Sequence, residues 1–344
     1  MSTLLPLTTA KGVSAYRLAL AVAVAIPVAA AGLGWLPSAV VVAALAVLAV
    51  ATIYLYDVNE WDDQPVPVVL AAMAASLLLG AVTTALIDGA LDGPGIVGFG
   101  RTGIDGRSVM MHGVVAPLAA VGLGLAGPLW LAARPRFDDM IDGVTFGVVS
   151  GTAYAAGETL LLYREVLADA PSSGGSAALW MSIVANAAIV KPVVYGAALG
   201  VAAAAFSGIG AGYEGFGRHF GRALAGAAIA MLAYGVGVAL AGEIDGSVGS
   251  ALGLAWGLVV AGGLIVILRT RIHQGILEAA LNAAQGKPSR HEARGEAFCG
   301  ECDLPLVPLA LFCSGCGTSV RATSKRRQHF NVKRTNPSAS RARA

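Results

Sequence analysis

Apolar stretches long enough to cross a lipid bilayer recur through the first 268 residues, and they restrict the possible folds more than any other feature. A span needs roughly 20 mainly apolar residues, and it is helical because its backbone groups find no water to bond. Charged residues form only 13% of the chain, about half the share found in soluble domains. The sequence therefore predicts an all-α polytopic membrane protein. We expect about eight transmembrane helices, at 15–36, 38–56, 66–87, 108–133, 143–163, 177–207, 222–241 and 247–268.

The sixth of these spans, 177–207, is interrupted by the pair Lys191-Pro192. Proline lacks a backbone N–H, and its ring disfavours a helical conformation in the residue before it. We expect either one continuous span or a half-helix followed by a span that starts near Lys191.

Charge divides the chain into two parts. Residues 1–268 contain ten Lys/Arg and sixteen Asp/Glu, whereas residues 269–344 contain thirteen Lys/Arg and five Asp/Glu. The two parts are therefore suited to different solvents. We expect a transmembrane helical bundle over 1–268, a juxtamembrane helix and linker over 269–297, a cysteine-containing module over 298–320 and a disordered basic tail over 321–344.

Lysine and arginine residues in the short loops predict the orientation, because cytoplasmic loops carry an excess of them. Eight spans place four basic pairs on the same side of the membrane: Lys11 and Arg17, Arg134 and Arg136, Arg218 and Arg222, and Arg269 and Arg271. We therefore expect both termini to be cytoplasmic.

All four cysteines lie in the stretch CGECDLPLVPLALFCSGCG, as Cys299-x2-Cys302 and Cys313-x2-Cys316. Two such pairs complete the tetrahedral set of four thiolates that zinc prefers in structural sites. The alternatives are four ordinary cysteines or two disulfides, and a cytoplasmic location disfavours disulfides. We expect one structural zinc ion here, in a module that resembles the short zinc ribbons of many bacterial proteins.

Glu158 is an isolated carboxylate inside the fifth predicted span. On a helix Gly147, Gly151, Tyr154 and Glu158 fall within about 60° of one another. Because small residues mark the face on which membrane helices pack, Glu158 is expected to point into the bundle. An intramembrane carboxylate indicates a functional site. The alternative is a protonated Glu that makes a single interhelical hydrogen bond.

The segment DGVTFGVVSGTAYAAGETLLLY resembles the signature of the PrsW-type intramembrane proteases, in which a DG-x3-G-x3-G run leads to an aromatic-x3-Glu motif and a Tyr. The matching residues are Asp142, Gly143, Gly147, Gly151, Tyr154, Glu158 and Tyr163. Upstream, an acidic loop, a proline and a helix ending in Gly80-Ala81 are also similar to the family. The resemblance covers about residues 50–240 and implies a multi-pass protein of a bacterial plasma membrane.

Several residues on which the family's activity depends are missing. The paired-glutamate motif Glu-Glu-x-x-Lys follows an Ala-Pro, yet after Ala116-Pro117 this chain has Ala119, Ala120 and Val121. The two later membrane histidines are replaced in a stretch that offers Val194 or Tyr195 and in another that offers Tyr234. Peptide hydrolysis needs a base that activates water together with an acid that protonates the leaving amine, or else a metal held by three protein ligands. The resemblance therefore implies a pseudoprotease that is not an enzyme and serves binding or scaffolding.

Two residues are candidate partners of Glu158. His112 lies about one turn into the fourth span, and Lys191 lies at the break in the sixth. The simpler interpretations are a histidine at the membrane interface and a snorkelling lysine, which we favour for both residues. The alternative function is an active intramembrane metalloprotease that uses Glu158 with His112. A transporter with Glu158 as its proton-coupled site is a third class.

The expected partners follow from the predicted parts of the chain. The bundle faces the lipid bilayer, and the zinc ribbon is suited to docking a cytoplasmic protein. The tail SKRRQHFNVKRTNPSASRARA is basic enough to contact anionic lipid. Nucleic acid is not expected, because Phe330 is the only aromatic residue in this tail.

Overall fold

A computed structural model describes residues 10–58, 66–91, 106–134, 140–168, 176–208, 215–244 and 246–284. The chain divides into two compact units, one formed by residues 14–52 and 67–275, the other by residues 1–13, 53–66 and 276–344. The helix bundle and the candidate site lie in the first unit. The zinc-ribbon cysteines and the basic tail lie outside the described residues.

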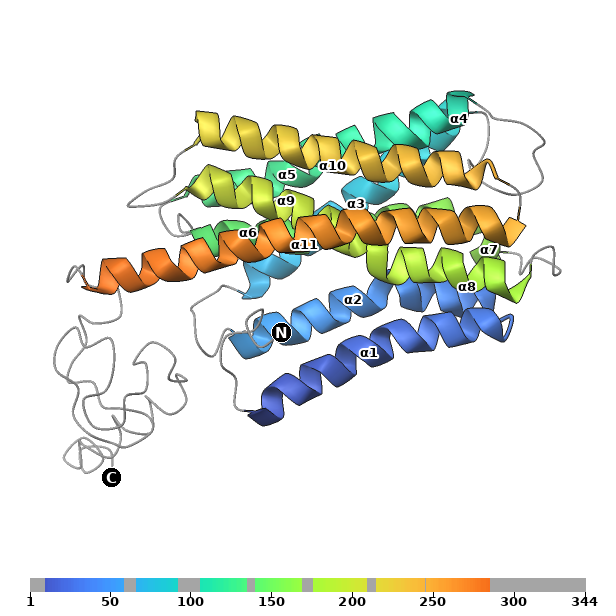
Figure 1. Ribbon diagram of the computed structural model, residues 1–344, viewed down its shortest axis with the longest axis horizontal. Coiled ribbons are helices and arrows are strands. Elements are labelled where there is room, and N and C mark those ends of the chain that lie inside the picture. Colours follow the sequence, from blue (N-terminus) through green and yellow to red (C-terminus); the bar gives the residue numbers. More distant parts are fainter. Residues whose placement is uncertain are drawn as a thin grey trace. The chain divides into compact units, whose positions relative to one another are not determined.

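The described residues form helices, with no β-strand among them, as the sequence predicts (Figure 1). The α-helices are α1 Ala10–Gly32, α2 Leu36–Val58, α3 Val66–Ala90, α4 Gly106–Met110, α5 Ala116–Ala132, α6 Met140–Leu162, α7 Arg164–Ala168, α8 Ala177–Ala185, α9 Lys191–Ser207, α10 Arg218–Gly242 and α11 Gly246–Ala284. Two π-helical turns complete the set, η1 Met111–Val115 and η2 Asn186–Val190. The helix predicted after residue 268 is thus continuous with the last span, as part of α11.

Five helical segments of the described chain are long and apolar enough to cross a membrane: Pro67–Ala90, Gly106–Ala132, Ala177–Ser207, Arg218–Gly242 and Gly246–Gly275. Shorter apolar helices cover Leu18–Gly32 and Leu36–Ala51. The protein is therefore membrane-embedded. The full count of eight spans stays a prediction.

The helix α6 is the centre of the bundle. Nearly every residue from Gly143 to Thr159 is buried, and the packing of α6 on α9 is the most extensive in the bundle. Glycines make the close approach possible: a Cβ atom added to Gly147 would lie 2.5 Å from the Leu199 carbonyl oxygen. A helix that packs on several neighbours in this way can carry small and polar residues, such as Gly147 and Glu158, on its buried faces.

Both π-helical turns precede a proline. The Ala116 N–H donates to the Met111 carbonyl just before Pro117, and the Lys191 N–H donates to the Asn186 carbonyl just before Pro192. A proline ring clashes with the carbonyl four residues back in a regular helix, and bonding to the fifth residue back widens the turn at that point. The chain therefore passes Lys191-Pro192 as one continuous helical segment, so the half-helix alternative is wrong.

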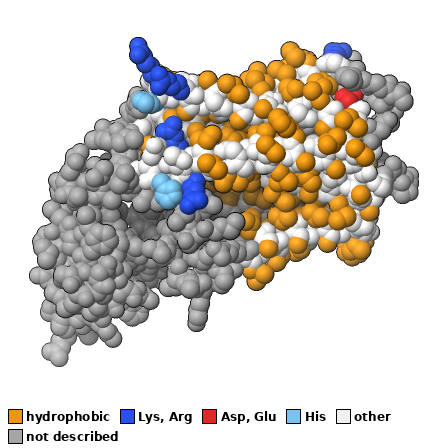
Figure 2. Space-filling model, viewed as in Figure 1, with side chains coloured by type: hydrophobic (Ala, Val, Ile, Leu, Met, Phe, Trp, Pro, Cys, Tyr) orange, Lys and Arg blue, Asp and Glu red, His pale blue; other side chains and the backbone are white. Residues whose placement is uncertain are grey.

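The outer surface of the bundle is apolar. Hydrophobic side chains cover the middle of the face shown in Figure 2, while Lys, Arg and His side chains gather towards one end. Ile229, Val259 and Val266 are 67%, 68% and 65% exposed. Such residues suit contact with lipid chains, because a soluble protein rarely exposes so continuous an apolar surface.

Contacts between helix ends bring together the described basic residues that the sequence predicts to be cytoplasmic. Ala132, Phe206 and Phe220 form one buried cluster, which joins the end of α5, the end of α9 and the start of α10. Leu268 of α11 packs on a second cluster that contains Ala223 of α10. One end of the bundle consequently carries Arg134, Arg218, Arg222, Arg269 and Arg271.

Candidate functional site

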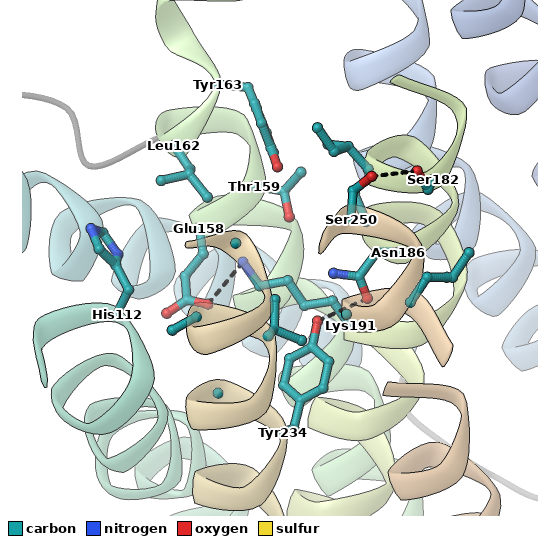
Figure 3. Close-up of a pocket in the computed structure, with 18 of the residues that line it drawn as sticks. His112, Glu158, Thr159, Leu162, Tyr163, Ser182, Asn186, Lys191, Tyr234 and Ser250 are labelled. Atoms are coloured by element: carbon teal, nitrogen blue, oxygen red, sulfur yellow. Dashed lines mark hydrogen bonds and ion pairs between the residues drawn. The ribbon is translucent and has the colours of Figure 1, made fainter. Parts of the chain in front are cut away.

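The buried carboxylate of Glu158 forms an ion pair with Lys191. Glu158 is 4% exposed in the last third of α6, and its Oε2 lies 3.1 Å from the Lys191 Nζ at the start of α9 (Figure 3). The Lys191 ammonium also lies 5.6 Å from the centre of the Tyr195 ring, which is within cation–π range. Glu158 therefore points into the bundle, as its helix face predicts, and two adjacent helices supply opposite charges to one place.

The expectation that Lys191 snorkels towards the membrane surface is wrong. Its side chain is only 14% exposed, and it lies beside Glu158 inside the bundle. A buried charge is costly unless it is paired, so the ammonium and the carboxylate each compensate the other.

The π-helical turn η2 sets which residues share the face of Lys191. Ser182, Asn186, Lys191 and Tyr195 all line one cavity. Their spacings are four, five and four residues. Residues five apart diverge on a regular α-helix, but a turn with i→i+5 bonding brings them to the same side. The widened turn thus continues a polar stripe from α8 into α9.

Two hydrogen bonds cross the cavity from this stripe. The Tyr234 hydroxyl of α10 donates to the Asn186 Oδ1, with 3.2 Å between the oxygens. The hydroxyl oxygens of Ser182 and Ser250 lie 2.8 Å apart and share a hydrogen bond between α8 and α11. Figure 3 shows both pairs on the side of Lys191 that faces away from His112. These contacts hold α10 and α11 against the α8–α9 segment.

His112 and Glu158 line the same cavity but are not hydrogen-bonded to each other. The Nε2 atom of His112 and the Oε1 atom of Glu158 are both buried, and neither has a partner within the described residues. Figure 3 shows His112, which lies in η1, on the opposite side of Glu158 from Lys191. Within the described residues, His112 and Glu158 therefore do not form the expected His–carboxylate pair, although both line one cavity.

The cavity has a volume of about 170 Å³ and extends from Glu158 and Lys191 to the turn between α10 and α11. Gly242, Ile244 and Gly246 line it at that turn, and we call these three residues the cavity mouth. The ion pair of Glu158 and Lys191 lies in the lining, and His112 is the third ionisable residue there besides the tyrosines. The described lining is thus polar at its centre and close to neutral in sum.

The helix α3 also packs against α6 next to Glu158. The Tyr154 hydroxyl donates to the Thr83 Oγ1 over 2.7 Å, and Arg164 forms an ion pair with the buried carboxylate of Asp88. Gly80 and Gly157 lie at the contact, where an added Cβ would meet the backbone of the other helix. Gly80 and Tyr154 are both residues of the predicted motifs, and here they serve helix packing.

The substituted motif positions fall into two groups. Ala120 and Val121, where the paired glutamates would stand, are buried in the apolar core cluster that contains Tyr154. Tyr195, which the resemblance offers with Val194 for the first histidine position, and Tyr234, which it offers for the second, line the cavity with Glu158. Their ring centres are 6.3 Å apart in an edge-to-face contact. Sequence reasoning noted these tyrosines only as replacements and missed Asn186, Ser182 and Ser250, which carry no motif signal.

No group of three or more His, Cys, Asp or Glu side chains placed to hold a metal ion occurs among the residues that the structure describes. The four cysteines predicted to bind zinc, Cys299, Cys302, Cys313 and Cys316, lie outside those residues. The zinc ribbon therefore stays a prediction.

Comparison of the chain with known protein families, curated proteins and solved structures finds no match. The resemblance to PrsW-type proteases accordingly rests on the sequence motifs alone.

Proposed function

We propose that this integral membrane protein binds a small polar ligand in the cavity around Glu158 and Lys191, and that it does not hydrolyse peptide bonds. The observation that carries the proposal is the 3.1 Å ion pair between these two side chains. It places side chains of opposite charge inside the bundle, beside a cavity of about 170 Å³. Ligand cavities are commonly apolar with a few placed polar groups.

The chemistry of the site argues against hydrolysis. A general base must take a proton from water, and a second group must protonate the leaving amine. One carboxylate oxygen of Glu158 is held by Lys191. The other oxygen, Oε1, has no hydrogen-bond partner among the described residues, so neither a histidine nor a second carboxylate is bonded to it. The positions where the PrsW-type family has its paired glutamates carry Ala119, Ala120 and Val121. We therefore infer a non-proteolytic relative of that family.

The C-terminal part would connect this bundle to the cytoplasm. In the proposed arrangement Cys299, Cys302, Cys313 and Cys316 hold one structural zinc ion, and the resulting ribbon docks a cytoplasmic protein. The basic tail contacts anionic lipid, and both termini lie in the cytoplasm of a bacterium. The clustering of five arginines at one end of the described bundle supports this orientation, since basic residues are enriched on the cytoplasmic side.

A cleavage assay tests the absence of hydrolysis. The full-length protein in lipid nanodiscs is incubated with fluorogenic single-span peptides, beside Glu158→Gln and the surface variant Arg222→Gln. We expect the same background signal from all three. Cleavage by the wild-type protein and Arg222→Gln that disappears in Glu158→Gln would overturn the proposal.

A second candidate function is an intramembrane metalloprotease that uses Glu158 with His112. The observation in its favour is that both residues line one cavity and each has a buried atom without a partner in the described part of the chain. Metal analysis separates the two functions. The first requires about one zinc per chain, lost when the cysteines are replaced. The second requires a further tightly held metal that His112→Ala removes.

A further inference from the structure

The charge balance of the cavity restricts what can bind there. Glu158 and Lys191 are in contact and cancel each other. An anion that takes Lys191 leaves Glu158 as an unpaired charge in a medium of low dielectric constant, and a cation that takes Glu158 does the same to Lys191. Breaking one half of a buried ion pair is strongly unfavourable. A ligand with a single charge is therefore disfavoured, whichever its sign.

A ligand that carries both charges avoids this penalty. The Oε1 atom of Glu158 is buried without a partner in the described residues, so it is able to accept a hydrogen bond from a ligand ammonium. The Lys191 ammonium has three N–H donors, and the contact with Oε2 of Glu158 engages one of them. A ligand carboxylate is thus a suitable acceptor for Lys191. Inserted beside the pair, such a molecule keeps every charge compensated.

The remaining lining suits the same kind of ligand. The Tyr195 and Tyr234 rings offer aromatic surface next to Lys191, and aromatic faces attract cations. The hydroxyl pair of Ser182 and Ser250 and the amide of Asn186 line the same cavity. These groups provide polar contacts in addition to the ion pair.

The size of the cavity limits the ligand further. An engineered protein cavity of roughly 150 Å³ holds benzene, and this cavity measures about 170 Å³. A molecule of about six heavy atoms is therefore appropriate. We propose that the cavity binds a small zwitterion, the simplest being an α-amino acid with a small side chain, through its ammonium on Glu158 and its carboxylate on Lys191. This inference rests on the proposed binding function.

The test compares alanine with its two single-charge analogues. The full-length protein in nanodiscs is titrated by calorimetry with alanine, with propionate and with ethylammonium. We expect alanine to bind at least about tenfold more tightly than either analogue. Equal or tighter binding of propionate or ethylammonium overturns the proposal, and so does the absence of alanine, glycine and serine binding to protein that is folded by circular dichroism.

Charge variants give a sharper test, because they should invert the preference. Glu158→Gln leaves Lys191 without its carboxylate, so propionate should now bind more tightly than alanine. Lys191→Gln should favour ethylammonium for the converse reason. Arg222→Gln, which removes an exposed charge outside the cavity, should leave the wild-type order unchanged. An unchanged order in both Glu158→Gln and Lys191→Gln overturns the proposal.

The exchange variant Glu158→Lys with Lys191→Glu guards against loss of folding in the single variants, since it keeps a buried ion pair. It should still bind alanine more tightly than both analogues, and a loss of that order in the folded variant counts against the proposal. Failure of the proposed function can be told apart from failure of this inference. Peptide cleavage that depends on Glu158 would contradict the proposed non-proteolytic function, whatever the titrations show.

Discussion

Asn186 and Lys191 lie five residues apart in the sequence, yet they line the same cavity because the helix between them contains one π-helical turn. The Lys191 N–H donates to the Asn186 carbonyl, five residues back. This turn, which begins at Asn186, connects Ser182 of α8 to the α9 residues Lys191 and Tyr195. It therefore decides which side chains meet Glu158.

Removing one residue from this turn should be tolerated. Deletion of Ala188 places the former Asn186 and Lys191 four residues apart, which is the spacing of one face on a regular α-helix. Pro192→Ala is needed in the same variant, since a proline inside a regular helix costs about 3 kcal/mol. We expect a melting temperature within a few degrees of wild type, measured in detergent by intrinsic fluorescence.

A deletion within the regular part of α9 is the matched control. Deleting the buried Ala198 rotates the residues beyond it by about 100° and misaligns their contact with α6. It should lower the melting temperature by at least about 5 °C, the shift expected for a loss of about 2 kcal/mol. If both deletions are equally harmful, η2 does not set the register as argued.

The ion pair should show strong coupling in a double-mutant cycle. Lys191→Met leaves Glu158 as an uncompensated buried charge, so it should lower the free energy of unfolding by about 3–5 kcal/mol. The double variant Glu158→Gln with Lys191→Met removes both charges and should recover most of this loss. Unfolding in detergent gives the free energy of unfolding of Glu158→Gln, Lys191→Met and the double variant. Additive effects of the two single changes would show that the side chains do not interact.

The contact between α6 and α9 should be sensitive to a single methyl group. A Cβ atom at Gly147 would lie 2.5 Å from the Leu199 carbonyl oxygen and 2.7 Å from the Gly200 Cα. Both are backbone atoms of a buried helix, so Gly147→Ala should lower the free energy of unfolding by about 1–3 kcal/mol. Gly122→Ala in α5 is the control, because nothing lies within 4 Å of its added Cβ. A smaller loss at Gly147 than at Gly122 contradicts the packing described.

Thiol labelling tests the proposed orientation together with the cavity mouth. Ile244 is 46% exposed at the mouth, and His219 is exposed at the opposite end of α10. In sealed vesicles a membrane-impermeant maleimide should label Ile244→Cys from the non-cytoplasmic side and His219→Cys from the cytoplasmic side, as resolved by peptide mass spectrometry. Labelling of both from one side would rule out α10 as a span.

Metal content tests the predicted zinc ribbon. Purified wild-type protein should contain about one zinc per chain, and Cys302→Ser with Cys316→Ser should lose it because only two thiolates remain. Atomic absorption measures the ratio. Zinc retained by this double variant would place the metal elsewhere.

The sequence by itself determined the all-helical, membrane-embedded character, since apolar stretches of sufficient length admit no other structure in lipid. It also determined the inward direction of Glu158, because Gly147 and Gly151 share its helix face and mark that face as the packing surface. These properties are local: they depend on composition and on the period of one helix.

Only the tertiary structure decided the partners of Glu158. His112 and Lys191 were both candidates in the sequence, and Lys191 forms the pair because α6 and α9 approach closely along their glycines. The register of Asn186 with Lys191 was equally hidden, since a π-helical turn shifts the face by one residue and leaves no distinct mark besides Pro192. Contacts between helices depend on how several of them pack at once, and the period of any single helix does not contain that information.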